Sequence, residues 1–158
     1  MDVVFCPPDV SANRYDAHSE RLMELDRHTL FQAWTERFDL WFAKPDSLLM
    51  TPVVNDPFFF QTEFDGRKHP HYGRFLRLEP DHLVEMTWVT GETGTDGAET
   101  VVTVVLTPDG ERTYLHLTHA GFLTEAARDR HRDAWFMVLE HMERQLLATQ
   151  QGGGETAS

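Results

Sequence analysis

The sequence has only one cysteine, Cys6, and this scarcity limits the chemistry that the chain can perform. A single cysteine cannot form a disulfide within the chain, and it cannot build a thiolate metal cluster. Cys6 also lies close to the N-terminus, before the regularly patterned part of the sequence, which argues against a nucleophilic role. Proteins of reducing compartments rarely have disulfides, and this chain cannot form one internally, so we expect a cytoplasmic location.

Long apolar runs are absent as well. No segment approaches the roughly 18 consecutive apolar residues of a membrane-spanning helix. The N-terminal stretch MDVVFCPPD has neither the basic region nor the long apolar stretch of a secretory signal. We therefore expect a chain that is not secreted and does not associate with a membrane.

Basic residues are few. Lysine and arginine number 14 against 26 aspartates and glutamates, which gives a formal net charge of −12. Nucleic-acid binding draws much of its affinity from lysine and arginine, so we expect no nucleic-acid partner. Residues 67–77, RKHPHYGRFLR, form the one clearly basic stretch, and we interpret them as a solvated strand and turn rather than an anion site.

Familiar catalytic and cofactor motifs are missing too. The sequence has no G-x-S-x-G nucleophile elbow, no P-loop, no G-x-G-x-x-G turn and no H-E-x-x-H pair. His69 and His71 could point the same way from an extended segment, but Pro70 separates them and no third ligand is evident. Catalytic zinc usually has three protein ligands. We therefore predict no metal site and no other cofactor.

What the chain does contain is the composition of a soluble globular domain. Its 158 residues, of which 41% are hydrophobic and 25% charged, are enough to close one core. We expect an N-terminal extension at residues 1–14 and a single domain at residues 15–149. Residues 150–158 lack apolar anchors, and we expect them to form a disordered tail.

Short apolar segments separated by turn residues fill the middle of the chain. Connections this short favour antiparallel neighbours, because a parallel crossover needs about a dozen residues or more. The sequence therefore predicts an antiparallel sheet. Its expected strands are residues 58–64, 72–78, 82–89, 100–106 and 112–122.

Two histidines three residues apart, His116 and His119, lie in the last expected strand. Because side chains alternate across a strand, the two point to opposite faces and cannot hold one metal ion. His119 shares the face of Leu115 and Leu117, which we expect to be the inner face. It is either a hydrogen-bonded histidine at the rim of the core or a polar anchor for a ligand.

Two segments show helical spacing. Residues 27–42 repeat large apolar side chains every four residues. Residues 124–150 carry an apolar stripe that begins at Trp135 and continues in steps of four, three and four. Thr124 is the expected N-cap of this second helix, and the glycine run at residues 152–154 is expected to end it.

Several segments, taken in order, resemble one protein family. They are ERLMELDRHTLFQAWT, LWFAKP, FDGRKHPHYGRFLRLEPDHLVEMTW, VVTVVLTPDGERTYLHLTHAGF and HRDAWFMVLEHMERQL. Together, over residues 19–148, they resemble the activator of Hsp90 ATPase homologue-like family of the START-like, Bet v 1-like (SRPBCC) superfamily. The chain departs from the family at residues 56–58, where a glycine pair is frequent, and at Ala134, where glycine is favoured.

The resemblance implies an α+β helix-grip fold. A curved antiparallel sheet would wrap around the long C-terminal helix, with two short helices after the first strand. An apolar cavity would lie between the sheet and the long helix. The resemblance does not fix the function, because lipid carriers, hormone binders, polyketide cyclases and chaperone-linked domains share this scaffold.

Large apolar side chains on the expected inner faces are the candidate lining of that cavity. His131 joins them because it lies four residues before Trp135, on the same helix face, and matches a position where the family often carries histidine. The alternative is that these side chains fill a closed core. The candidate ligand-binding residues are Trp34, Trp41, Phe60, Phe64, Met86, Trp88, His119, His131, Trp135, Leu139 and Met142.

We expect a binding module for a small hydrophobic molecule, either a lipid or an aromatic metabolite, with no catalysis assigned. A protein-interaction module, with a chaperone or a second copy of the chain as its partner, is the first alternative. A cyclase-like or hydrolytic enzyme that uses His119, His131 or a nearby carboxylate is the second. It ranks last because no acid–base pair can be assigned from the sequence.

Overall fold

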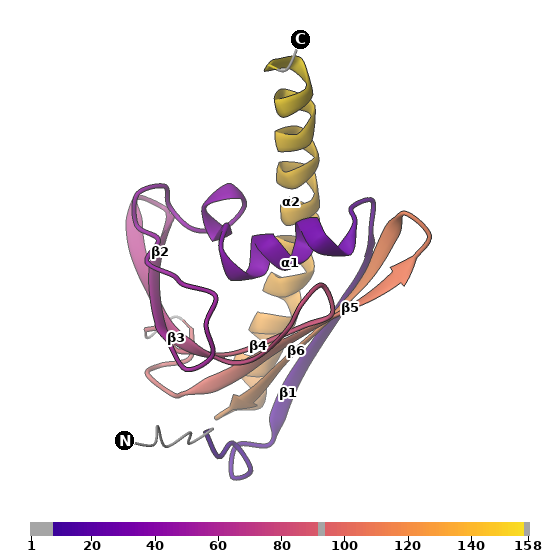
Figure 1. Cartoon of the computed structure of the whole chain (residues 1–158). Coiled ribbons are helices and arrows are strands. Elements are labelled where there is room, and N and C mark those ends of the chain that lie inside the picture. Colours follow the sequence, from indigo (N-terminus) through magenta and orange to yellow (C-terminus); the bar gives the residue numbers. More distant parts are fainter. Residues whose placement is uncertain (1–7, 92–93, 157–158) are drawn as a thin grey trace, which may run out of the picture.

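The computed structural model describes residues 8–91 and 94–156 of the chain (Figure 1). Six antiparallel strands form one sheet in the order β1-β6-β5-β4-β3-β2, and a long C-terminal helix packs against β1 and β6. The expected α+β helix-grip fold is confirmed. In chain order the elements are β1 (Tyr15–Met23), α1 (Arg27–Thr35), the 3-10 helix η1 (Phe38–Leu40), β2 (Pro57–Phe64), β3 (Arg67–Glu79), β4 (Leu83–Trp88), β5 (Thr100–Asp109), β6 (Arg112–Phe122) and α2 (Glu125–Thr156).

A two-residue turn joins β2 to β3 and sets their register. Asp65 and Gly66 both have positive φ, 53° and 71°, as a type I′ hairpin turn requires. Pairing therefore begins at once, with Phe64 opposite Arg67. For this reason β3 begins at Arg67, and the prediction that it begins at residue 72 is wrong.

The last strand, β6, lies between β5 and the N-terminal strand β1. Its side chains alternate as expected: Leu115, Leu117 and His119 are buried, whereas His116 is exposed. The prediction that the two histidines lie on opposite faces is confirmed. Irregular register in β1 and β3 accompanies the curvature of the sheet.

The first expected helix divides into two pieces. α1 ends at Thr35, and η1 follows at Phe38–Leu40, so the prediction of one helix over residues 27–42 is wrong, whereas the two short helices are confirmed. The break lets Trp41 fold back over α1, where its indole Nε1 donates to the carbonyl oxygen of Ala33 at 2.9 Å. Burial of the Phe38 and Trp41 rings stabilises the fold more than the extra backbone hydrogen bonds of a continuous helix would.

The long helix α2 lies in the curve of the sheet, and its C-terminal part extends beyond the sheet (Figure 1). Thr124 caps it as expected, because its hydroxyl accepts from the backbone N–H of Ala127 at 3.1 Å. The helix continues to Thr156, so the expected end near residue 150 is wrong. Each added helical residue gains a backbone hydrogen bond, whereas a glycine costs only about 1 kcal/mol relative to alanine.

Parts of the two expected terminal segments lie outside the described residues. These parts are residues 1–7, which include Cys6, and residues 157–158.

Candidate functional site

The space between the sheet and the helices is filled by large side chains. Trp34, Phe38 and Trp41 pack as neighbouring rings with centroids 4.8 to 5.5 Å apart. Phe60 of β2 stacks on Phe38 at 5.0 Å. Six of the predicted ligand-binding residues belong to this closed core rather than to a cavity. They are Trp34, Trp41, Phe60, Met86, Leu139 and Met142.

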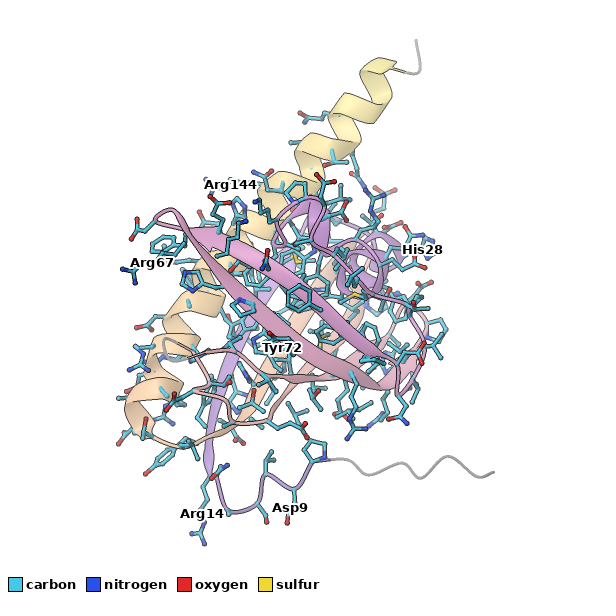
Figure 2. The ribbon with its side chains drawn as sticks, turned by 90° about the vertical axis from the view of Figure 1, so that its left-hand side faces the viewer. Asp9, Arg14, His28, Arg67, Tyr72 and Arg144 are labelled. Atoms are coloured by element: carbon cyan, nitrogen blue, oxygen red, sulfur yellow. The ribbon has the colours of Figure 1, made fainter. Side chains whose placement is uncertain are left out.

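An open groove lies beside this core. It has a volume of about 960 Å³ and is bounded by the β2–β3 hairpin, the end of β4 with the segment after it, and the first half of α2. Figure 2 shows the hairpin from its outer side, with Arg67 at the tip near α2 and Tyr72 on the outer face. Four predicted residues line the groove, namely Phe64, Trp88, His131 and Trp135.

Phe64 reaches the groove in an unexpected way. It was predicted to face the interior with Phe60, but 70% of its surface is exposed. It is the last residue of β2, and at this position the hairpin has passed beyond the edge of the core. The prediction of an inward-facing Phe64 is therefore wrong, although the side chain borders the groove.

Three aromatic rings form one wall of the groove, which we call the aromatic wall: Phe42, Trp88 and Trp135. Their centroids lie 5.5 Å apart for the two tryptophans, and Phe42 is 6.1 Å from Trp88 and 6.3 Å from Trp135. Phe42 was absent from the candidate residues, because its position follows from the break after α1, which helical spacing does not predict. Trp88 and Trp135 are only 3% and 4% exposed, whereas Phe42 is half-buried, so Phe42 presents more of the wall's apolar surface to the groove.

His119 is sealed behind the aromatic wall, with 0% of its surface exposed. The indole N–H of Trp135 donates to its Nδ1 at 3.0 Å. Nδ1 is therefore an acceptor and the proton lies on Nε2, which is 2.7 Å from the hydroxyl oxygen of Thr100. That hydroxyl donates in turn to the carbonyl oxygen of Trp88 at 2.5 Å.

Both ring nitrogens of His119 thus have protein partners, and burial lowers its pKa well below the ordinary value. Protonation would place an Nδ1–H against the indole N–H of Trp135. Of the two roles left open by the sequence, the geometry supports a hydrogen-bonded histidine at the rim of the core.

His131 lies on the groove side of α2. Its ring is 4.4 Å from that of Phe122 and 5.2 Å from that of His119. Its Nδ1 lies 2.8 Å from the carbonyl oxygen of Ala127, one turn earlier. Burial lowers the pKa of His131, and the hydrogen bond to Ala127 opposes this shift.

His71 is a groove residue that the sequence did not identify. It is only 7% exposed, stacks on Phe60 at 4.8 Å, and has Nδ1 at 3.0 Å from the carbonyl oxygen of His69. Burial lowers its pKa to about 4. The sequence signal that identifies His71 is the Asp65–Gly66 turn. A two-residue turn at this point pairs His71 with Phe60 across the hairpin, and Phe60 faces inward.

Within residues 8–91 and 94–156, no group of three or more histidine, cysteine, aspartate or glutamate side chains could hold a metal ion. None of the helices in this part of the chain combines the length and the apolar character needed to cross a membrane.

The match to known families covers most of the chain. A family model described as "Activator of Hsp90 ATPase homolog 1-like protein" matches residues 24–146. The chain belongs to this family. No protein of curated function matches the sequence.

Solved structures with the same fold come from several bacteria. A protein from Mesorhizobium loti is 22% identical with a TM-score of 0.70, over 85% of this chain and 98% of its own. One from Rhodobacter sphaeroides is 21% identical with a TM-score of 0.70, over 93% and 96%. The Aha1 dimer from Colwellia psychrerythraea is 16% identical with a TM-score of 0.64, over 83% and 95%. At these identities the likeness shows the fold alone.

Proposed function

We propose that the groove binds a compact, mainly apolar molecule, with an aromatic metabolite favoured over a long-chain lipid. The observation that carries this proposal is the groove of about 960 Å³ with its aromatic wall of Phe42, Trp88 and Trp135. Ligand pockets in proteins typically occupy about 300–1,000 Å³ and are lined mostly by apolar and aromatic side chains. Val138 and the methyl group of Ala134 add apolar surface from α2.

The filled core supports a compact ligand over a long one. A fatty acyl chain would need a deep channel between the sheet and α2, and Trp34, Phe38 and Phe60 occupy that space with no exposed surface. A ligand of two or three fused rings needs only the groove. Burial of its faces against the aromatic wall would supply most of the affinity.

Binding is also better supported than catalysis. General acid–base catalysis needs a group within hydrogen-bond reach of the proton that it transfers, with a pKa near the operating pH, and a neighbouring carboxylate is one way to raise a histidine pKa. His119 has both nitrogens occupied, and among the described residues no carboxylate is hydrogen-bonded to His71 or His131. We therefore assign no reaction to the groove.

A variant that fills the groove tests the proposal. Ala134 is an exposed residue of α2 that lines the groove, so Ala134→Trp adds a large side chain there without disturbing the core. The matched control is Ala148→Trp, at an exposed position further along the same helix. Thermal unfolding is measured for all three proteins with 2-naphthol and with oleate.

We expect 2-naphthol to raise the unfolding temperature of the wild type and of Ala148→Trp. At 100 times its Kd, a ligand stabilises the folded state by about 2.7 kcal/mol. Ala134→Trp should lose this response. A response to 2-naphthol that survives in Ala134→Trp, or a larger response of the wild type to oleate, would contradict the proposal.

A protein-binding role is the second candidate. Phe136 and Met137 on α2 are 60% and 69% exposed, which is unusual for side chains so large and apolar. The family description names an activator of Hsp90 ATPase, and one protein of the same fold is a dimer. Sedimentation of the chain alone and with purified Hsp90 tests this role. Association that Phe136→Ser and Met137→Ser abolish would favour it.

A further inference from the structure

Three histidines line the groove, His69 and His71 from β3 and His131 from α2. In His71 and His131, Nδ1 lies within hydrogen-bond distance of a backbone carbonyl oxygen, at 3.0 Å and 2.8 Å respectively. A carbonyl oxygen only accepts, so Nδ1 must carry the proton in both rings. In a neutral imidazole the other nitrogen is then a bare acceptor.

Both rings are neutral near pH 7. Burial is the main cause that lowers the pKa of each, to about 4 in His71. Charge on His131 further lowers the pKa of His71, so the two rings disfavour each other's protonation. Nε2 of His71 and Nε2 of His131 are therefore two hydrogen-bond acceptors in the lining of the groove.

Among the residues that the structure describes, no protein group is hydrogen-bonded to these two acceptors. Within the described residues, each histidine makes one hydrogen bond, through Nδ1. The nearby indole N–H of Trp135 already donates to His119. The cationic side chain that borders the groove, Arg67, is exposed at the tip of the hairpin, as is the carboxylate of Asp65. A bound ligand is the group that can pair with Nε2 once water has left the groove.

We propose that the groove selects aromatic ligands that carry a hydroxyl or N–H group, and that Nε2 of His71 or of His131 accepts the hydrogen bond from it. This inference rests on the proposed function. It adds a hydrogen-bond donor to the ligand, which the aromatic wall alone does not require. A carboxylate brings only acceptors, so it would leave both Nε2 atoms unpaired. A methyl ether or a bare hydrocarbon would do the same.

The size of the selection follows from hydrogen-bond energetics. One neutral hydrogen bond changes affinity by about three- to tenfold, and leaving a half-buried acceptor unpaired adds to the difference. We therefore expect a hydroxyl-bearing ligand to bind about tenfold more tightly than its methyl ether.

The test compares three probes with the same ring system: 2-naphthol, 2-methoxynaphthalene and 2-naphthoate. The first carries a donor, the second only an ether oxygen, and the third a negative charge. Dissociation constants are measured by calorimetry near pH 7 on the wild type, His71→Phe, His131→Phe and His116→Phe. Phenylalanine keeps the ring, including the stacking of residue 71 on Phe60, and removes Nε2. His116 is exposed on the outer face of β6 and serves as the matched control.

For the wild type and His116→Phe we expect 2-naphthol to bind about tenfold more tightly than 2-methoxynaphthalene, and 2-naphthoate to bind most weakly. In His71→Phe, in His131→Phe or in both, the preference for 2-naphthol over 2-methoxynaphthalene should fall to about threefold or less. The dissociation constant of 2-methoxynaphthalene should stay unchanged. His131→Phe gives this answer even where His71→Phe disturbs folding, because residue 131 is only half-buried.

Three results would overturn the inference. Equal binding of 2-naphthol and its methyl ether would reject the two histidine acceptors and leave the proposed function standing. Tightest binding of 2-naphthoate would also reject them and point to recognition of an anion. Failure of all three probes to bind the wild type would count against the proposed function, and the inference would fall with it.

Discussion

The buried chain of hydrogen bonds around His119 makes a quantitative prediction about Thr100. The Thr100 hydroxyl accepts from Nε2–H of His119 at 2.7 Å and donates to the carbonyl oxygen of Trp88 at 2.5 Å. Thr100→Val removes both bonds and nearly preserves the shape of the side chain. His119 cannot move its proton to the other nitrogen, because Nδ1 must accept from the indole of Trp135.

The expected cost is about 2–4 kcal/mol of unfolding free energy. A buried donor left without a partner costs about 1–3 kcal/mol, and the lost bond to the Trp88 carbonyl adds about 1 kcal/mol. Thr100 and His119 both have 0% exposure, so water cannot replace the missing hydroxyl.

Urea denaturation, followed by tryptophan fluorescence, measures this cost. The matched control is Thr103→Val on the same strand, where the hydroxyl donates to a side-chain oxygen of Glu85 at 2.9 Å in a half-exposed position. The control should lose less than about 1 kcal/mol, because surface substitutions seldom cost more. If Thr100→Val lost no more than the control, the deduced tautomer and the sealed position of His119 would be refuted.

Other predictions concern pH, packing and the hairpin tip. Because burial lowers the pKa of His71 to about 4 and that of His119 well below 6.5, the unfolded chain binds protons that the folded chain does not. The unfolding free energy should therefore fall as pH drops below about 6.5, by about 1.4 kcal/mol per pH unit for each histidine. Urea titrations at several pH values measure this dependence, and His71→Phe should show a smaller slope of unfolding free energy against pH. Gly73→Ala should lower the unfolding free energy by more than about 2 kcal/mol in the same assay, because a Cβ there overlaps the Thr87 carbonyl oxygen and the Phe58 ring. A near-neutral result would contradict the close packing of β3. Phe64→Ser should change stability by less than about 0.5 kcal/mol in thermal unfolding, because the side chain is exposed, and a large loss would contradict its placement.

Much of the fold could be predicted from the sequence because its signals are local. Alternation in β6 separated His116 from His119, and turn residues between short apolar segments indicated an antiparallel sheet. Element ends were less predictable. α1 stops at Thr35 because Phe38 and Trp41 gain more by entering the core than the helix gains by continuing, and this balance depends on contacts distant in sequence.

The candidate site was harder to predict, for a related reason. Whether large inward side chains leave a cavity depends on how their volumes fit together, and periodicity reports direction only. Trp34 and Phe60 point inward as expected, yet they close the core. The sequence suggests His71 only as a metal pair with His69, whereas its place in the groove follows from its cross-strand neighbour Phe60 and from the packing of α2.

We propose above that the groove beside the aromatic wall binds a compact aromatic ligand. The most direct measurement is an NMR titration of the isotope-labelled chain with 2-naphthol, which reports binding residue by residue. We expect saturable shifts at the amides of Thr62, Thr90 and Ala134 and at the indole N–H of Trp88, with little change at Glu20 on β1. Shifts centred on β1, or no shifts at millimolar ligand, would contradict the proposal.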